Sequence, residues 1–405
     1  MKQLSMREQF THKEVADAYN SALRAGVSSP FAHMAKVLTG MGRGDVTRHM
    51  TRGWVSNLDD SEVVEDADRA KTLVQKRNQQ ISNNQLRRDH RALVDRVNEL
   101  ELTRDVLESI VDSLNERKPQ PIKIKDNPKG LPMTVEMLLS DLQIGKLGAG
   151  YDTGVAQRRL KEYGEAAVFQ IKQKADAGYR VERIVLALLG DIIESSKKHA
   201  NSAKATDTDT AEQIHDSIVG IMEYIIDPLA SLGIPFEINC IAGNHDWDDH
   251  GIEQWKPGRR MLAYPIYKGL ELICKRSGYH HVHFNIPDGV YMIAEIYGHK
   301  VLYEHGVGIA ATESAMKAHK IKRSEQQQEY ISLMRMADKH VVTFANAGQF
   351  IVNGAFFGAT KAGIEYSEIA GYSSVPAQVM CFHVPRHDAR SPLYDIFIVQ
   401  LEHVV

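Results

Sequence analysis

The sequence predicts an α/β fold preceded by a helical region. Short runs rich in Val, Ile and Leu predict buried strands, because strands covered on both faces show no alternation of polar and apolar residues. These runs lie at 134–140, 183–189, 236–242 and 300–303. Segments of helical character at 155–177 and 210–229 follow the first two runs. This alternation of strand and helix is typical of the α/β class.

The composition allows at least one large hydrophobic core. The chain has 405 residues, of which 43% are apolar, so two domains are expected. Its net charge is only -3, and any contact with nucleic acid therefore needs a local basic surface.

The cysteines and the N-terminus predict a soluble cytoplasmic protein. Cys240, Cys274 and Cys381 are widely spaced, show no zinc-type pairing and cannot form a complete disulfide framework. Residues 1–13 have no apolar core like that of a signal peptide, and no uninterrupted apolar run of about 18 residues occurs. We therefore expect no membrane association.

Residues 1–57 form the first predicted domain. Apolar positions at helical spacing, separated by glycines, predict three short helices between 12 and 54. The stretch 31–38, a glycine turn and 45–52 together have the size of a helix-turn-helix, which would expose Arg43, Arg48 and His49 to DNA. A small packing or oligomerisation module explains the same pattern.

Residues 58–118 are predicted to form one long helix, since 61–117 contain neither proline nor glycine. Leucines recur every seven residues, at Leu86, Leu93, Leu100, Leu107 and Leu114. Such a ladder predicts a homodimeric coiled coil through 83–114. Additional apolar residues broaden the stripe, so the helix could instead lie on its own catalytic domain. A proline-containing linker at 119–132 then precedes the domain at 133–405.

Each predicted strand is followed directly by a short polar motif. The motifs are Asp141-Leu-Gln143, Gly190-Asp191-Ile-Ile-Glu194, Gly243-Asn244-His245-Asp246 and Glu304-His305-Gly306. Loops at the carboxyl ends of neighbouring strands converge, and this edge of an α/β sheet is where ligands bind. The motifs therefore predict one composite site.

The residue types match a site for two divalent cations. Such a site needs a carboxylate that bridges the ions, together with separate oxygen and imidazole ligands for each ion. Asp191 is the predicted bridge, and Gly190 lets the backbone turn sharply before it. Asp141 and Gln143 are predicted to bind the first ion, since side chains two residues apart in an extended segment point the same way.

The later motifs complete the predicted site. Asn244 offers an amide oxygen and His305 a ring nitrogen to the second ion. His245 is then available as a general acid for the leaving oxygen, with its charge state held by a neighbour such as Asp246.

In order and character these motifs resemble those of the calcineurin-like metallophosphoesterase superfamily, which read D-x-H, G-D-x-x-D, G-N-H-D/E, a lone H, then G-H-x-H. The resemblance spans 133–405, and segments 139–146 and 351–356 are most similar to the phage and prophage DNA-repair-exonuclease-like branch. It implies a β-sandwich of two mixed sheets flanked by helices. It also implies phosphodiester hydrolysis with two divalent ions, Mn²⁺ or else Mg²⁺, Fe²⁺ or Zn²⁺, on DNA in a bacterial or phage-infected cell.

The chain departs from that pattern at three places. Gln143 replaces a histidine ligand, and Glu194 replaces the second aspartate, which supports the ligands without binding metal. No G-H-x-H follows. In one alignment His340 replaces its first histidine and Val342 its second. In the other, which we prefer, 340–342 is a strand before a deleted motif and 332–339 is helical. Either alignment loses at least one ligand.

Other polar clusters carry weaker predictions. The histidines at 280, 281 and 283 follow a glycine in a predicted edge strand and are interpreted as structural or solvated. Lys197 and Lys198 lie in a polar loop that could guide a phosphate backbone or could simply be solvated.

The motifs together predict a metal-dependent phosphodiesterase, a DNA exonuclease or endonuclease, impaired by the departure near His340. One alternative is a catalytically silent DNA-binding or assembly protein that keeps the fold. Another is an enzyme that acts on a phosphomonoester or nucleotide. A small pocket in place of an open groove would favour this alternative.

Overall fold

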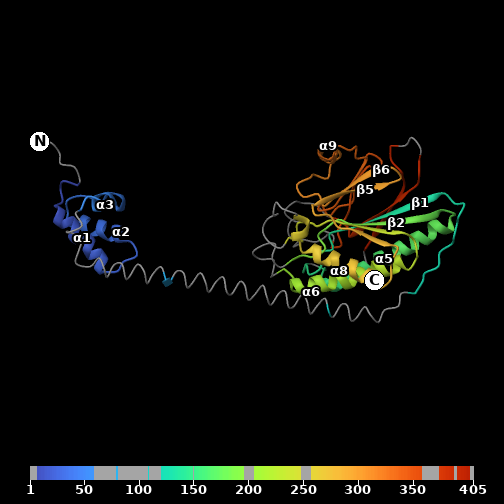
Figure 1. Ribbon diagram of the computed structural model, residues 1–405, viewed down its shortest axis with the longest axis horizontal. Coiled ribbons are helices and arrows are strands. Elements are labelled where there is room, and N and C mark those ends of the chain that lie inside the picture. Colours follow the sequence, from blue (N-terminus) through green and yellow to red (C-terminus); the bar gives the residue numbers. More distant parts are fainter. Residues whose placement is uncertain are drawn as a thin grey trace. The chain divides into compact units, whose positions relative to one another are not determined.

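The computed structural model describes residues 7–58, 79–80, 108, 120–148, 150–195, 205–247, 257–357, 374–386 and 390–401. The chain divides into two compact units, Met1–Glu99 and Leu100–Val405, which are described separately below (Figure 1). The predicted leucine ladder at 83–114 and the residues Lys197 and Lys198 lie outside the described ranges.

The N-terminal unit contains the three predicted helices, α1 (His12–Arg24), α2 (Pro30–Thr39) and α3 (Arg48–Val55). Thr11 and Glu14 form a capping box at the start of α1, which satisfies amide groups that the first turn leaves unpaired. Val15, Met34 and Leu38 are fully buried in the core between the helices. The helices are thus held by a small apolar core of their own.

Arg43 makes two hydrogen bonds within the N-terminal unit. This residue lies before α3, where its guanidinium donates a hydrogen bond to Glu14 and another to the carbonyl of Gln9, at 3.0 and 3.1 Å. Arg43 thus links the loop before α3 to the start of α1, and because its side chain is 46% exposed its predicted DNA contact remains a prediction. Arg48 and His49 are exposed, but the loop from Gly40 to Thr47 is longer than the turn of about three or four residues in a helix-turn-helix.

The C-terminal unit contains two mixed sheets. The first has strand order β11-β10-β1-β2-β3-β4, with β1 to β4 parallel. Its strands are β1 (Pro132–Leu139), β2 (Arg180–Leu188), β3 (Phe236–Cys240), β4 (Val282–Asn285), β10 (Ala377–His383) and β11 (Leu393–Gln400). The second has order β5-β6-β7-β9-β8. Its strands are β5 (Tyr291–Ile296), β6 (His299–Glu304), β7 (Leu333–Met336), β8 (Thr343–Ala345) and β9 (Phe350–Val352).

The two sheets pack against each other, and helices cover their outer faces. Leu138 from β1 packs with Val301 and Leu333 of the second sheet, whereas Met137 and Leu139 face the helices, as the two-residue alternation of a strand requires. Helices on the first sheet are α5 (Thr153–Asp176), α6 (Thr210–Gly220), α7 (Asp227–Ala230) and α8 (Ala263–Arg276), while α9 (Glu313–Gln327) covers the second (Figure 1). The predicted α/β fold of two mixed sheets flanked by helices is confirmed.

A fully buried polar cluster joins the two sheets. Glu136 on β1 accepts hydrogen bonds from Arg335 on β7 at 3.1 Å, from Tyr303 on β6 at 2.7 Å and from His383 on β10 at 2.9 Å. All four side chains are inaccessible to solvent. Burial would raise the pKa of Glu136, but the charge of Arg335 and the hydrogen bond from His383 hold it at about 2. The cluster therefore fixes β1, β6, β7 and β10 relative to one another through an ionised carboxylate.

The prediction of a helix at 332–339, followed by a strand at 340–342, is wrong. Residues Leu333–Met336 form strand β7, which pairs in parallel with both β6 and β9. The methionine-rich sequence with its central Arg335 shows no strand periodicity. The arginine is tolerated inside the sandwich because Glu136 neutralises its charge. His340 consequently lies in the loop after a strand.

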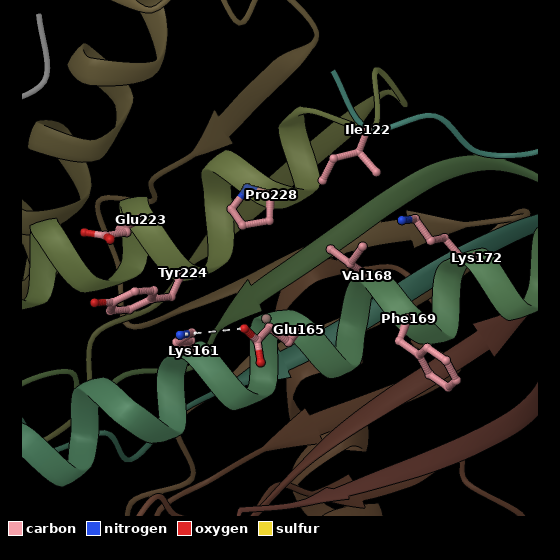
Figure 2. Close-up of a pocket in the computed structure, with 10 residues that line it drawn as sticks. Ile122, Lys161, Glu165, Val168, Phe169, Lys172, Glu223, Tyr224 and Pro228 are labelled. Atoms are coloured by element: carbon pink, nitrogen blue, oxygen red, sulfur yellow. Dashed lines mark ion pairs between the residues drawn. The ribbon is translucent and has the colours of Figure 1, made fainter. Parts of the chain in front are cut away.

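A cavity of about 610 Å³ lies on the helical face of the first sheet. Figure 2 shows its lining residues on α5, on the π-helical turn Ile221–Ile226 and its continuation, and on the segment around Ile122. Phe169 is 56% exposed at this cavity, and Lys161 and Glu165 form an ion pair on its α5 side. No predicted site residue lines it, so this cavity is separate from the composite site.

The described part of the chain contains no helix with the length and apolar character needed to cross a membrane. Cys240, Cys274 and Cys381 are all buried, with no disulfide among them.

Candidate metal centre

Strands from both sheets deliver polar side chains to one place. Asp141 and Gln143 follow β1, Asp191 follows β2 and Asn244 follows β3. From the second sheet, His305 follows β6, and Asp338 and His340 follow β7. One ligand atom each from Asp141, Asp191 and His305 lies within 4.8 Å of the others, and all three residues are buried. The structure thus brings the predicted ligands of both ions together.

Asp191 lies at the centre of this group. Its Oδ1 accepts a hydrogen bond of 2.7 Å from the backbone N–H of His245, and its Oδ2 lies 3.2 Å from Nε2 of His305. Nε2 of Gln143 approaches the same Oδ2 at 3.5 Å. Asp191 therefore lies beside one predicted ligand of each ion, Gln143 and His305, and its bridging role remains a prediction.

Two glycines make this close approach possible. Gly190 has a φ of +90°, and a Cβ there would lie 2.2 Å from the backbone nitrogen of Gly243. A Cβ on Gly243 would lie 2.1 Å from Oδ1 of Asp191. The loops after β2 and β3 can touch only because both residues lack a side chain.

Asp141 and Gln143 provide buried oxygens that lack hydrogen-bond partners. Asp141 is inaccessible to solvent, and neither of its carboxylate oxygens has a hydrogen-bond partner among the described residues. Oε1 of Gln143 is likewise buried and has no hydrogen-bond partner among the described residues. Because burying such groups unsatisfied is costly, a bound cation would complete their environment. This is the strongest indication that the residues present fit a metal ion.

His305 is oriented for metal binding by its second nitrogen. Its Nδ1 lies 2.7 Å from the carbonyl of Leu189, so the Nδ1–H donates there and Nε2 faces Asn244 Oδ1 at 3.1 Å and Asp191. A carbonyl partner of this kind fixes the tautomer of metal-binding histidines. Burial alone would lower the pKa of His305, but the carboxylates of Asp191 and Asp141 raise it to about 10. A metal ion at Nε2 would replace that proton.

The loop after β7 brings two side chains to the site, His340, which the sequence named as a candidate ligand, and Asp338, which it did not. Asp338 Oδ1 lies 3.6 Å from Nε2 of His305, and Nε2 of His340 lies 3.4 Å from Oδ1 of Asp141. Asp338 and His340 therefore lie beside predicted ligands, and we interpret Ala337-Asp338-Lys-His340 as the counterpart of G-H-x-H, two residues away from the alternative that set His340 at the first position. Strand β7 at Leu333–Met336 contradicts the helix on which the preferred alignment, with the motif deleted, was based.

Sequence reasoning missed Asp338 because it searched this segment for histidine. A signal was nevertheless present. Asp338-x-His340 repeats the spacing of Asp141-x-Gln143, and both pairs come directly after a buried strand.

The ring of His245 contacts Glu194. The sequence had suggested Asp246 as its partner instead. Nδ1 of His245 is within hydrogen-bonding distance of the backbone carbonyl oxygen of Glu194 at 3.2 Å and also lies 3.2 Å from its Oε2, whereas its Nε2 lies 4.0 Å from Asp191 Oδ2. Lys146 Nζ approaches the same Oε2 at 3.6 Å and is nearly buried. Glu194 therefore orients the ring of His245, and its supporting role at the metal centre remains a prediction.

Asp246 instead organises the backbone of the site. Its fully buried carboxylate accepts hydrogen bonds from the N–H groups of Asp191, Ile192, Ile193 and Gly243 at 2.7 to 3.3 Å. Burial and the nearby charge of Asp191 raise the pKa of Asp246 to about 7. The residue fixes the loop that carries the predicted bridging ligand, and this accounts for its place next to His245.

Two further groups of potential ligands are less suited to metal. Glu136, Cys381 and His383 lie close together, but the guanidinium of Arg335 already neutralises Glu136 and would repel a cation. Of the histidines at 280, 281 and 283, His281 contacts the carbonyl of Ala230 at 2.9 Å and the other two are exposed. Their predicted structural or solvated role agrees with these positions.

Without metal, the protein should become less stable as the pH rises from 6.5 to about 10. The pKa of His305 is raised from 6.5 to about 10, so its charge stabilises the fold below pH 6.5, and this contribution is lost as the pH rises through 10. The raised pKa of Asp246 acts in the same direction from pH 3.8 to about 7. Added Mn²⁺ should reduce the fall, because it competes with protons for the same ligands.

Scanning calorimetry across this pH range, with EDTA or with Mn²⁺, measures the effect. The His305→Gln variant is the control, and its melting temperature should vary less with pH. A wild-type melting temperature in EDTA that rises toward pH 10 would contradict the prediction.

Comparison with solved structures finds phosphoesterases and Vps29 at low sequence identity. The chain is similar to an archaeal phosphodiesterase, with a TM-score of 0.28 and 10% identity, covering 65% of this chain and 99% of that chain. It is similar to zinc-bound Vps29 from Entamoeba histolytica, with a TM-score of 0.26 and 9% identity, covering 66% and 99%. A predicted phosphoesterase from Streptococcus pneumoniae TIGR4 gives a TM-score of 0.26 and 11% identity, covering 66% and 98%. No protein-family model and no curated protein sequence matches the chain.

Proposed function

We propose that the protein is a metal-dependent phosphodiesterase of the calcineurin-like metallophosphoesterase type, and that DNA is its substrate. The observation that carries the proposal is the convergence of Asp141, Asp191 and His305, with both oxygens of Asp141 buried and without a hydrogen-bond partner in the described structure. Buried carboxylates in this state suit divalent cations. Mn²⁺ is the proposed ion, and Mg²⁺, Fe²⁺ and Zn²⁺ suit the same donor set.

Each ligand has a place in this proposal. Asp191 would hold both ions. Asp141, Gln143 and His340 would hold the first ion, since His340 lies beside Asp141 and Gln143 beside Asp191. Asn244, His305 and Asp338 would hold the second ion, since Nε2 of His305 faces both Asn244 and Asp338. When bound, the two ions would neutralise charge on the phosphate and supply the water that attacks phosphorus.

His245 is the proposed general acid. Its Nδ1 is held by Glu194, so its Nε2 remains directed toward the centre and can donate a proton to the leaving oxygen. Lys146 partly balances the charge of Glu194, so that this carboxylate is shared between two cations when His245 is protonated.

Hydrolysis of labelled single- and double-stranded DNA with Mn²⁺ tests the proposal, with Asp191→Ala beside the wild type. We expect cleavage by the wild type and none by the variant, because a bridging ligand contributes to both ion sites. Lys161→Ala, on the exposed face of α5, is the matched control and should cleave normally. DNA binding without cleavage would instead support the catalytically silent DNA-binding or assembly protein.

A nucleotide phosphatase is the second candidate. A small cavity of about 200 Å³ opens beside Asn244 and His305. A nucleoside monophosphate should therefore be offered beside the DNA substrates. Release of phosphate from it, without cleavage of DNA, would favour this candidate.

The N-terminal unit supplies the proposed DNA contact of a phage-type protein, through Arg48 and neighbouring basic residues. A homodimer through 83–114 would place two such units on one DNA. The DNA contact and the homodimer are proposals based on the sequence alone. The assignment to a bacterial or phage-infected cytoplasm rests on the same basis.

A further inference from the structure

The cavity beside the second group of ligands has apolar walls. It has a volume of about 200 Å³ and begins at Asn244 and His305. Trp247, Val290 and Val307 form its sides. Val307 is 51% exposed even though it follows the buried strand β6 almost directly. The side chains of Trp247, Val290 and Val307 thus give the cavity an apolar wall beside the polar site.

The acidic residue at this cavity is already neutralised. Glu304 accepts hydrogen bonds from His319 at 2.7 Å and from Nε of Arg323 at 3.1 Å, both on α9. The negative charge of Glu304 is therefore balanced by side chains of α9. The cavity consequently offers apolar surface and an aromatic ring, and it does not suit a second phosphate or a free cation.

The volume limits what can enter. Pockets for drug-sized ligands have volumes from about 300 Å³ upward, so the cavity has room for one ring system only. Its position next to Asn244 and His305 means that a group within it would be attached to a phosphate held at the metal centre.

We propose that this cavity binds the flat ring of the organic group on the phosphate ester, a nucleobase, with Trp247 as its aromatic wall. The inference rests on the proposed function for the position of the phosphate. Stacking of a base on an aromatic side chain contributes about 1–3 kcal/mol, so the ring should strengthen binding at least about 5-fold.

Calorimetric titration with three phosphate monoesters tests this proposal, with Ca²⁺ in place of Mn²⁺ to limit turnover. The probes are thymidine 5′-phosphate, phenyl phosphate and methyl phosphate, which differ in the group on the phosphate. Thymidine 5′-phosphate should bind at least about 5-fold more tightly than methyl phosphate. Phenyl phosphate equal to the thymidine ester would show that any aryl ring suffices, and weaker binding would show preference for the nucleoside.

Two variants act on the cavity in opposite ways. Trp247→Ala removes the aromatic wall, and Val307→Trp fills the space from an exposed position that the core does not depend on. Both should abolish the difference between the thymidine and methyl esters. Phe169→Ala at the separate cavity of Figure 2 is the control and should keep it.

The inference is overturned if the wild type binds all three esters equally or binds none, or if both variants keep the wild-type preference. Because binding is measured without hydrolysis, a failure of the cavity proposal is distinguishable from a failure to cleave DNA. A protein that prefers the thymidine ester but cleaves nothing would retain the cavity and lose the phosphodiesterase assignment.

Discussion

Arg335→Met should destabilise the protein by about 3–5 kcal/mol, because it leaves the buried carboxylate of Glu136 without its charge partner. Both side chains of this pair are wholly inaccessible to solvent. The variant would also raise the pKa of Glu136 from about 2, since burial would no longer be opposed by a guanidinium. Methionine keeps most of the length of arginine, so the loss would reflect charge more than volume.

Thermal unfolding measures this effect, with a fall in melting temperature of roughly 6–20 °C. The double variant Glu136→Gln with Arg335→Met should regain part of the loss, because no buried charge is then left alone. Lys161→Met is the surface control. Its pair with Glu165 is exposed and should contribute less than about 1 kcal/mol. An Arg335→Met protein as stable as the surface variant would refute the structural role of the cluster.

Asp338→Ala and His340→Ala should each lower Mn²⁺ affinity and metal-dependent hydrolysis at least about 100-fold. Even residues that only support a metal ligand cost about 10–100-fold when removed, and both side chains approach the predicted ligands directly. Asp338→His restores the residue of the G-H-x-H pattern and should retain activity within about 10-fold of the wild type. Lys161→Ala, on the exposed face of α5, is the control, since Nζ of Lys339 is paired with Oδ2 of Asp338 at 2.6 Å and its removal would disturb the tested carboxylate.

Calorimetric titration of Mn²⁺ in the absence of substrate separates metal binding from catalysis. If both alanine variants bind Mn²⁺ as tightly as the wild type, the loop after β7 is not part of the centre. The interpretation in which the fifth motif is missing would then return.

The predictable part of the fold lies where the residue pattern is local. Apolar runs at 134–140 and 183–189 correspond to β1 and β2 within a few residues, because both strands are buried on both faces. Strand β7 was not predictable in this way. It contains Arg335, whose partner Glu136 is distant in the sequence, and only the assembled sandwich makes a buried arginine acceptable.

The candidate site was predictable where a motif marks the end of a strand. Asp141, Asp191, Asn244 and His305 meet as expected, although their roles as ligands remain predictions. The partner of His245 could not be predicted. Asp246 is its neighbour in the sequence, but the Asp246 carboxylate accepts hydrogen bonds from the backbone of the loop after β2. Glu194, which follows β2, contacts the ring instead.

The backbone at the centre has a consequence for attempts to make this protein more heat-resistant. Asp141, Gln143, Asp191, Asp338 and His340 all have positive φ, between 41° and 66°, a region that costs roughly 1–3 kcal/mol for residues with side chains. Glycine at these positions would relieve the strain and remove the proposed ligands. A library selected only for survival at high temperature should therefore accumulate glycine there, and its most durable members should be the ones that no longer bind metal.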